Sequence, residues 1–507
     1  HSTSGSHERY KSEERLEWES DNDCNKKFEK WILKNKLCST KKIKNIKDEI
    51  KKYVKEEKRL AWDLYKGPIN QAKNNLIDTI NNLEKPLNNK FVNELFLNIE
   101  DTNFSELIKI CRKIIYQLEG GESNDKKILI NWKNKYLNIL TEKYSTNLYS
   151  INFDILKDID IKKPKYSDSK EMVDGRIIIR DNFDKLLEKN SRLFIFGEDV
   201  GKIGDVNQGL EGLQKKHGKN RVFDTGIRES TIVGQGIGMS IRGLRPIAEI
   251  QYLDYILYAL QILSDDLATL TYRTLGGQKA PLIVRTRGHR LEGIWHSGSP
   301  LGGMLSFLKG IFILTPRNMT QAAGFYNSLL DIDQPAIVIE PLNGYRTKEQ
   351  LPINYAEFKT PIGSVEVLKS GKDITIISYG STLNIVYEVA KELINYNIDC
   401  EVIDIQSLIP FDIDMNISKS IIKTNRLLII DEDVPGGGSS FILQELLNKQ
   451  DIYKHLDSEP TLLTANDHRP PYGTDGDYIS KPSFEDIFEK VYLIMNEANP
   501  DKFKKLN

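Results

Sequence analysis

The first third of the chain alternates apolar and charged positions with the period of an α-helix. Residues 25–33 space their apolar side chains three and four apart, as an amphipathic helix does. A longer charged helix is predicted from Ile43 to Tyr65, and Gly67-Pro68 marks its end. Strand-like alternation is not evident before about residue 160. The pattern therefore predicts a polar helical region, and its composition suggests no site of its own.

The hydrophobic pattern changes after a polar stretch at residues 162–170, which we interpret as a linker. Beyond it, short apolar runs alternate with helical segments. The runs are residues 193–196, 245–250, 281–285, 311–314 and 336–339. Apolar strands separated by helices are typical of a parallel sheet that is covered on both faces.

A second series of the same kind begins near Gly363, with apolar runs at residues 374–378, 400–404 and 426–430. The segment 341–361 separates the two series. We therefore predict an α/β protein with two parallel-sheet domains behind a mostly helical region. The predicted domains are residues 1–165, 166–350 and 351–507.

Composition narrows the class of protein. Hydrophobic residues make up 39% of the chain and the net charge is -1, which argues against a nucleic-acid or membrane-surface protein. No apolar run approaches the ~18 residues that span a bilayer, and no signal peptide is evident. The four cysteines are far apart and form no CxxC pair, so we expect reduced thiols. The expected location is the cytoplasm of a bacterium, or the mitochondrial matrix in a eukaryote.

Two acidic segments are candidates for chemistry. Glu198 follows the first apolar run directly, in Gly197–Gly201, where it could bind a polar ligand or cap the next helix. Glu229 precedes a small-residue helix that holds Gly234, Gly236 and Gly238. Glu229 could belong to a site, or it could be a helix-start carboxylate favoured by the helix dipole. The glycines lie within the helix, so they are not a dinucleotide-binding fingerprint.

Two histidine-bearing segments are further candidates. Residues 287–300 form a loop after an apolar run that holds His289 and His296, either as site residues or incidentally. The small-polar start His1–Ser6 could be a site loop or a disordered end. The sequence contains no nucleophile elbow, P-loop, metal-ligand spacing or Gly-Asp-Gly signature. The residues alone thus predict two α/β domains with a carboxylate–histidine site.

Together, the motifs of residues 170–500 resemble the beta subunit of the pyruvate and branched-chain 2-oxo acid dehydrogenases. They are GEDVG (197–201), RVFDTGIRES (221–230), GLRPIAEIQYLDY (243–255), WHSGSP (295–300) and LTPRN (314–318). The last domain, with Asp-Glu-Asp at 431–433 before Gly-Gly-Gly at 436–438, looks like the transketolase C-terminal domain.

The start of the chain, HSTSGSHERY, is similar to the active-site loop of the alpha subunit in the same family. It departs from that loop at Gly5 and Ser6, which replace an acidic pair, and at Arg9-Tyr10, which reverses the usual order. The resemblance implies a fused alpha–beta chain. It also implies that the segment with Gly-Asp-Gly, which would bind the diphosphate through Mg²⁺, precedes His1.

The resemblance implies thiamine diphosphate as coenzyme. It assigns Glu229 to the aminopyrimidine ring nitrogen, Tyr255 to stacking on that ring, and Glu198 to the same binding site. His296 matches the histidine that assists reductive acylation of a lipoyl group, and His1 matches one near the thiazolium. A structural K⁺ held by backbone carbonyls maps onto Ala280, Leu282 and Ile283.

The expected function is oxidative decarboxylation of a 2-oxo acid, with a branched-chain substrate favoured over pyruvate and acyl transfer to a lipoyl domain. The expected partners are a lipoyl acyltransferase and a second copy of the chain. Transketolase or deoxyxylulose-phosphate synthase is disfavoured by the alpha-like loop at the start of the chain and by the WHSGSP segment (295–300). A non-catalytic assembly or regulatory protein remains the alternative from another class.

Overall fold

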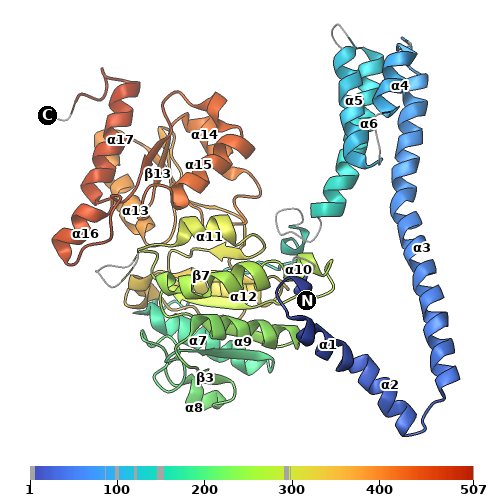
Figure 1. Cartoon of the computed structure of the whole chain (residues 1–507). Helices are drawn as coiled ribbons and strands as arrows, with labels where there is room; N and C mark the ends of the chain where they lie inside the picture. Colours follow the sequence, from blue (N-terminus) through green and yellow to red (C-terminus); the bar gives the residue numbers. More distant parts are fainter. Residues whose placement is uncertain are drawn as a thin grey trace. The chain divides into compact units, whose positions relative to one another are not determined.

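The computed structural model describes residues 6–505, apart from 86, 98–101, 119–122, 146–152, 291–295 and 297. The chain divides into two compact units, His1–Tyr144 and Ser145–Asn507, which are described separately below (Figure 1). Among the described residues, no helix combines the length and the apolar character that crossing a membrane requires.

The first unit is helical, as its sequence pattern predicts. Four helices begin with a Ser, Asp or Asn cap whose side chain accepts a bond from the first turn. The core of this unit lies among α3, α5 and α6, where Leu76, Cys111 and Leu129 are fully buried. The elements are η1 (His7–Arg9), α1 (Glu13–Asp21), α2 (Cys24–Lys34), α3 (Thr40–Asn81), α4 (Asn89–Leu97), α5 (Phe104–Gln117) and α6 (Asn124–Ser145).

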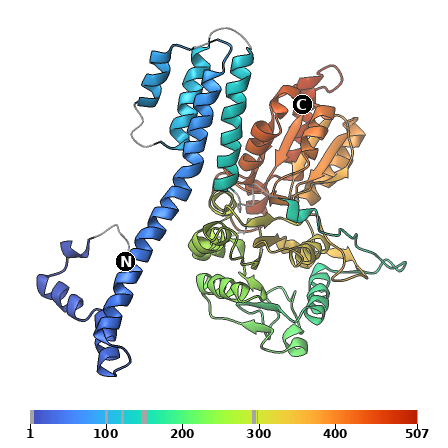
Figure 2. The same cartoon turned by 90° about the vertical axis from the view of Figure 1, so that its right-hand side faces the viewer.

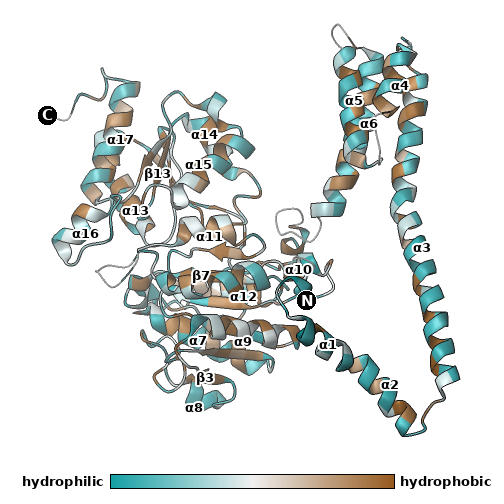
Figure 3. Cartoon of the chain, in the orientation of Figure 1, coloured by the Kyte–Doolittle hydropathy of each residue, from teal (hydrophilic) through white to brown (hydrophobic). Residues whose placement is uncertain are grey.

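The predicted end of the long helix at Gly67-Pro68 is wrong. Helix α3 continues through Pro68 to Asn81, and apolar bands recur along this helix in Figure 3. Proline in a helix interior removes one hydrogen bond and costs about 3 kcal/mol or more. The residues that follow it, from Ile69 to Ile80, bury one face in the core of the first unit. Tertiary packing therefore overrides the local preference.

Two sheets form the framework of the second unit. In the described residues, seven strands follow the order β12-β6-β7-β5-β4-β2-β3, and five follow the order β14-β13-β10-β11-β9. Neighbouring strands are parallel except at β12 and β9, which are antiparallel edge strands. The larger sheet contains β2 (Leu193–Gly197), β3 (Val222–Asp224), β4 (Arg245–Glu249), β5 (Ile283–Arg287), β6 (Phe312–Leu314), β7 (Ala336–Glu340) and β12 (Ser407–Ile409).

The smaller sheet contains β9 (Glu366–Lys369), β10 (Ile374–Ser378), β11 (Cys400–Asp404), β13 (Leu427–Ile430) and β14 (Thr461–Leu463), and β1 (Met172–Asp174) pairs with β8 (Lys348–Gln350). The longer helices are α7 (Gly175–Lys189), α9 (Glu229–Ile241), α11 (Leu301–Phe307), α12 (Met319–Leu329), α13 (Thr382–Glu392), α14 (Asn416–Thr424), α15 (Gly438–Lys449), α16 (Thr474–Ser480) and α17 (Phe484–Ala498), with the short α8 (Leu213–His217) and α10 (Leu270–Arg273). Short helical turns are η2 (Asp154–Leu156), η3 (Leu253–Ala259), η4 (Ile262–Leu267), η5 (Leu342–Tyr345), η6 (Leu393–Tyr396) and η7 (Ile452–His455).

The predicted apolar runs are the central strands, and the α/β class is confirmed. Each residue of β4, β5, β7, β10 and β11 is buried, as expected for strands covered on both faces. One strand was not foreseen. Residues 407–409, from the second α/β series, pair with β6 and complete the sheet of the first series. Figure 2 shows the green-to-yellow and orange-to-red parts lying directly against each other.

Candidate active site

The candidate site lies at the carboxyl edge of the larger sheet, where ligands of parallel α/β sheets usually bind. Glu198 follows β2, Glu229 is the first residue of α9 after β3, and Tyr255 lies in η3 after β4. A Cβ atom on Gly197 would lie 2.5 Å from the carbonyl oxygen of Glu249. Glycine at that position lets β2 and β4 stay close at the point where Glu198 leaves the sheet.

The segment that carries Glu198 is fixed to both neighbouring strands. The amide of Gly201 donates to Oδ1 of Asp224, 2.6 Å away at the end of β3. Nε2 of Gln251, just beyond β4, donates to Oδ2 of Asp199 over 3.1 Å. Asp199 thus binds a side chain of the next segment and is not a helix cap. These contacts hold Glu198 at a fixed place between the ends of β3 and β4.

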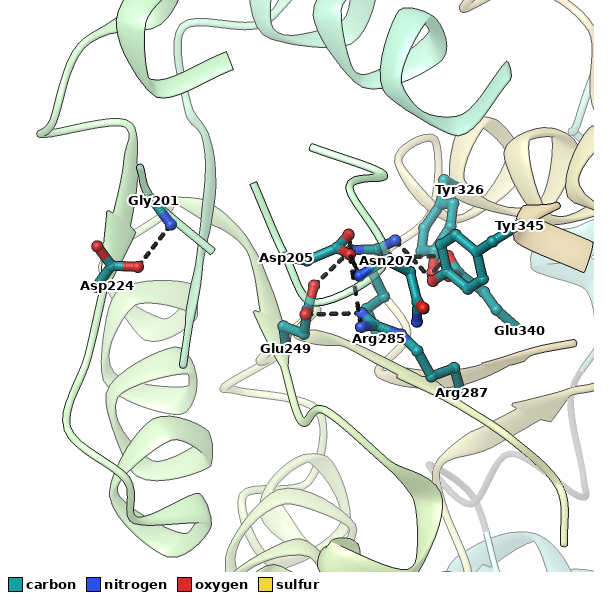
Figure 4. Close-up of polar contacts among 10 residues, drawn as sticks. All are labelled: Gly201, Asp205, Asn207, Asp224, Glu249, Arg285, Arg287, Tyr326, Glu340 and Tyr345. Atoms are coloured by element: carbon teal, nitrogen blue, oxygen red, sulfur yellow. Dashed lines mark hydrogen bonds and ion pairs between the residues drawn. The ribbon is translucent and has the colours of Figure 1, made fainter. Parts of the chain in front are cut away.

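A fully buried network of charged side chains contacts Asp205, which follows Glu198 in the same segment (Figure 4). Nη1 of Arg285 donates to Oδ2 of Asp205 over 2.8 Å and also contacts Glu249, while its Nε donates to Oε1 of Glu340 over 2.9 Å. Arg287 lies 2.7 Å from Oε1 of Glu249. Burial opposes the charge on Asp205, but the two arginines lower its pKa.

The tyrosines in Figure 4 complete this network. The hydroxyl of Tyr326 donates to Oε1 of Glu340 over 2.7 Å, and the hydroxyl of Tyr345 donates to the other oxygen of the same carboxylate. Nη2 of Arg285 donates to the Tyr345 hydroxyl over 2.9 Å. Removing one partner from such a network would leave a buried charge uncompensated. The network therefore ties Asp205, and with it the Glu198 segment, rigidly to β5 and β7.

Glu198, Glu229 and Tyr255 lie close enough to influence one another electrostatically. Burial raises the pKa of Glu198, and the negative charges of Asp199 and Glu229 raise it further. Burial also raises the pKa of Tyr255, with smaller contributions from several neighbours that include Glu198 and Glu229. A half-buried carboxyl pair beside an aromatic ring suits a flat, nitrogen-containing ring that exchanges a proton.

His296 joins the same cluster. Its Nδ1 lies 3.0 Å from Oδ2 of the buried Asp254, and its side chain is 22% exposed. The imidazole stacks on Tyr255 with centroids 5.8 Å apart and meets Tyr252 edge-on at 5.6 Å. The ring is thereby oriented by a carboxylate on one side and two aromatic rings on the other, with Nε2 left for chemistry.

The other sequence-predicted residues are placed as follows. His1 lies outside the described residues. Ala280 and Leu282 are buried, and their carbonyl oxygens accept bonds from the amides of Leu282 and Ala336, while Ile283 opens β5. The K⁺ assignment to these residues stays a prediction. The described residues contain no cluster of His, Cys, Asp or Glu that could hold a metal ion, and the four cysteines are free thiols.

Sequence reasoning missed the residues that support the site. Asp254 precedes Tyr255 directly, but its partner His296 is 42 residues away, and neither residue signals the other. Asp205 and Arg285 are 80 residues apart in the chain. A buried arginine within an apolar strand was the one available signal, because an arginine there needs carboxylate partners.

Comparison with known proteins now defines the class. Residues 171–348 match the transketolase pyrimidine-binding domain, and residues 363–478 match the transketolase C-terminal domain. The pyruvate dehydrogenase E1 component subunit beta of Acholeplasma laidlawii is 32% identical over 311 residues, which cover 61% of this chain and 94% of that relative. The 2-oxoisovalerate dehydrogenase subunit beta of Pseudomonas aeruginosa is 32% identical over 324 residues, or 60% of this chain and 90% of the relative.

A solved split-gene transketolase, an inactive beta4 tetramer, aligns with 62% of this chain and 95% of its own at a TM-score of 0.49 and 20% identity. The domain matches place residues 171–478 in the transketolase-like class of thiamine-diphosphate enzymes. The chain belongs to the family of thiamine-diphosphate-dependent 2-oxo acid dehydrogenase E1 beta subunits. The family uses thiamine diphosphate. The assignment of Glu198, Glu229 and Tyr255 to the aminopyrimidine end of that coenzyme stays a prediction.

Proposed function

We propose that this chain takes part in the oxidative decarboxylation of a 2-oxo acid and in the transfer of the acyl group to a lipoyl domain. The observation that carries the proposal is the placement of His296, oriented by Asp254, beside the Glu198, Glu229 and Tyr255 cluster. A histidine there can serve a second substrate at the same site where a coenzyme ring would be held.

In this proposal the coenzyme and the site residues have separate roles. Thiamine diphosphate, when bound, supplies the electron sink for decarboxylation. Glu229, at the amino end of α9, holds a proton at the aminopyrimidine ring nitrogen. Glu198 adds a second carboxyl group with a raised pKa, and Tyr255 packs against the ring. The rigid network around Arg285 keeps these groups in place.

His296 handles protons during acyl transfer. Its Nδ1–H donates to the Asp254 carboxylate, which fixes the tautomer and leaves Nε2 to give or take a proton at the lipoyl sulfur. Because the imidazole is partly exposed, a lipoyl arm can reach it. The partner in this proposal is the lipoyl acyltransferase of a 2-oxo acid dehydrogenase complex.

An alpha-like segment with Gly-Asp-Gly would complete the site by binding the diphosphate through Mg²⁺. His1 would lie near the thiazolium in the completed site, and a K⁺ ion would bind the carbonyls of Ala280, Leu282 and Ile283. Two copies of a fused chain would face each other to form these sites, as a homodimer. The free thiols support a reducing location such as the bacterial cytoplasm.

The favoured substrate is a branched-chain 2-oxo acid, with pyruvate as the alternative. The names of the relatives include both pyruvate and 2-oxoisovalerate dehydrogenases. The ratio of kcat/KM for the two acids, measured on the enzyme completed with an alpha-like segment, decides between them.

The proposed function is tested by His296→Ala in the completed enzyme. Acyl transfer to a lipoyl domain should fall by about 10²–10⁴, the usual cost of losing an acid–base group. Decarboxylation with an artificial electron acceptor should fall much less. His455→Ala, in η7 of the C-terminal domain, is the matched control. Equal losses in the two assays would remove His296 from acyl transfer, and absence of thiamine diphosphate binding would favour a non-catalytic assembly protein.

A further inference from the structure

The base of the loop that carries His296 is anchored in the C-terminal domain. Arg290 lies six residues before His296 and is 4% exposed. Its Nη1 donates to Oγ of Ser480 over 2.8 Å and to the carbonyl oxygen of the same residue over 3.2 Å. Its Nη2 donates to the carbonyl oxygen of His468 over 2.8 Å and reaches that of Asn466 at 3.5 Å.

The same part of the C-terminal domain holds the loop a second time, at His296 itself. Nη1 of Arg469 donates to the carbonyl oxygen of His296 over 3.2 Å. Beside this contact, Cδ of Pro470 lies 3.7 Å from the position that a Cβ on Gly298 would take. One short stretch of chain therefore binds both Arg290 and His296 and lies beside Gly298.

That stretch, residues 466–480, is itself closed by internal hydrogen bonds. Nδ2 of Asn466 donates to the carbonyl oxygen of Ile479 over 2.7 Å. The backbone amide of Asn466 donates to the carbonyl oxygen of Ser480 over 3.0 Å. The amide of His468 donates to the carbonyl oxygen of Asn466 over 2.8 Å. The carbonyl groups that receive Arg290 are thus presented by a preformed turn, which suits the rigid fork of a guanidinium group.

We propose that Arg290 and Arg469 are positioning residues through which the C-terminal domain holds His296 against Asp254 and Tyr255. The inference rests on the acyl-transfer role proposed for His296. According to this proposal, residues 466–480 set the orientation of His296. That orientation in turn sets how efficiently the enzyme uses its lipoyl substrate. Neither arginine contacts a reacting atom in this assignment.

The first test measures how tightly His296 is held in the chain of residues 1–507. Modification of each histidine by diethyl pyrocarbonate is followed by mass spectrometry. In Arg290→Gln, the rate at His296 should rise about tenfold, since a lost charged hydrogen bond weakens local structure by that order. Arg290→Lys should not restore protection, because one ammonium group cannot reach both Ser480 and His468.

The matched control is Arg221→Gln. Arg221 also binds three backbone carbonyls, those of Leu193, Asn190 and Leu187, but none in the loop of His296. Its loss should leave modification of His296 at the wild-type rate. Arg290→Gln changes a buried residue and could impair folding. Arg469→Gln changes an exposed residue, so it tests the same proposal without that risk. It should speed modification by a smaller factor while the melting temperature stays unchanged.

The second test uses the completed enzyme. Arg290→Gln and Arg469→Gln should raise the KM for a lipoyl domain. They should also lower acyl transfer more than they lower turnover with an artificial acceptor. A folding defect alone would lower both activities equally. Wild-type modification of His296 in both arginine variants overturns the proposal. So does an equal increase in Arg221→Gln. If His296→Ala spares acyl transfer while the arginine variants still expose His296, the acyl-transfer role fails and the anchoring stands.

Discussion

The imidazole of His296 and the carboxylate of Asp254 form a hydrogen-bonded pair, with Nδ1 and Oδ2 3.0 Å apart. Asp254 is 5% exposed and lies in the turn after β4, whereas His296 comes from the loop after β5. A buried carboxylate on Nδ1 fixes which nitrogen carries the proton in the neutral ring. The pair therefore sets the orientation of the imidazole and leaves its Nε2 for proton transfer.

We expect Asp254→Asn to lower acyl transfer by up to about 10²-fold, the lower part of the range for acid–base groups. Asparagine keeps the shape but removes the carboxylate that orients the ring and fixes its tautomer. The rate of acyl transfer at a fixed pH is the measurement. A wild-type rate in Asp254→Asn would mean that the pair has no part in proton transfer.

Glu229→Gln should abolish most coenzyme activation while the fold survives. Glutamine keeps the size and part of the hydrogen bonding of Glu229 but removes its acid, so the completed enzyme should lose about 10²–10⁴ in rate. The measurement is hydrogen–deuterium exchange at the thiazolium carbon of the coenzyme, together with thermal melting. Glu211→Gln, at an exposed position, is the control. Normal melting and wild-type exchange in Glu229→Gln would leave it as a helix-start carboxylate.

Stability of the α/β unit should depend on pH through His289. Burial alone would lower the pKa of this histidine, but Asp431, Glu432 and Asp433 raise it to about 9 from the ordinary 6.5, and Tyr379 stacks on its ring. Because the folded pKa is the higher one, this contribution, up to about 3 kcal/mol, is fully present below pH 6.5. It declines as the pH rises from 6.5 and is lost above about 9.

The check on His289 is a series of melting temperatures between about pH 6 and about pH 9.5, for the wild type and His289→Gln. The wild type should lose stability across this range, and the variant should be less stable at the acid end and show a flatter dependence. Parallel curves for the two proteins would show that His289 does not carry the pH dependence.

Pro68→Ala should stabilise α3, because alanine restores one helical hydrogen bond and relieves a clash with the preceding turn. The gain should approach the cost of an interior proline, about 3 kcal/mol. Gly67→Ala, whose Cβ would have open space, should add about 1 kcal/mol. Slower hydrogen exchange at the amides of residues 64–72 is the measurement. Unchanged exchange in Pro68→Ala would indicate that the helix is already bent around the proline without strain.

Much of the α/β framework was predictable because its strands are apolar on both faces. The runs at 193–196, 336–339 and 374–378 all became buried strands. The pairing of β12 with β6 was not predictable, since residues 407–409 differ little from any other short apolar run and only the packed domains bring them to that edge. The passage of α3 through Pro68 was missed for a related reason, because the buried face that sustains the helix comes from distant helices.

The candidate site was only partly predictable. Glu198, Glu229 and His296 stood out as polar groups that follow apolar runs or precede a helix, whereas Tyr255 and the roles of Glu229 and His296 came from the resemblance to the dehydrogenase beta subunits. Their supports lie far away in the chain, and side-chain types alone do not show which distant carboxylate or carbonyl each will contact. Arg290 illustrates this, since three of its four acceptors are backbone oxygens about 180 to 190 residues later, and backbone oxygens have no sequence signature.

The strand β12 also has a consequence for the synthesis of the chain. Until residues 407–409 have left the ribosome, β6 presents an unpaired edge of buried apolar residues, a state that promotes wrong pairing with other chains. The sheet of the first α/β series is therefore complete only after part of the second series has been synthesised. Its last strand arrives about 90 residues after β6, so the edge stays unpaired until about the first third of the second series has been synthesised.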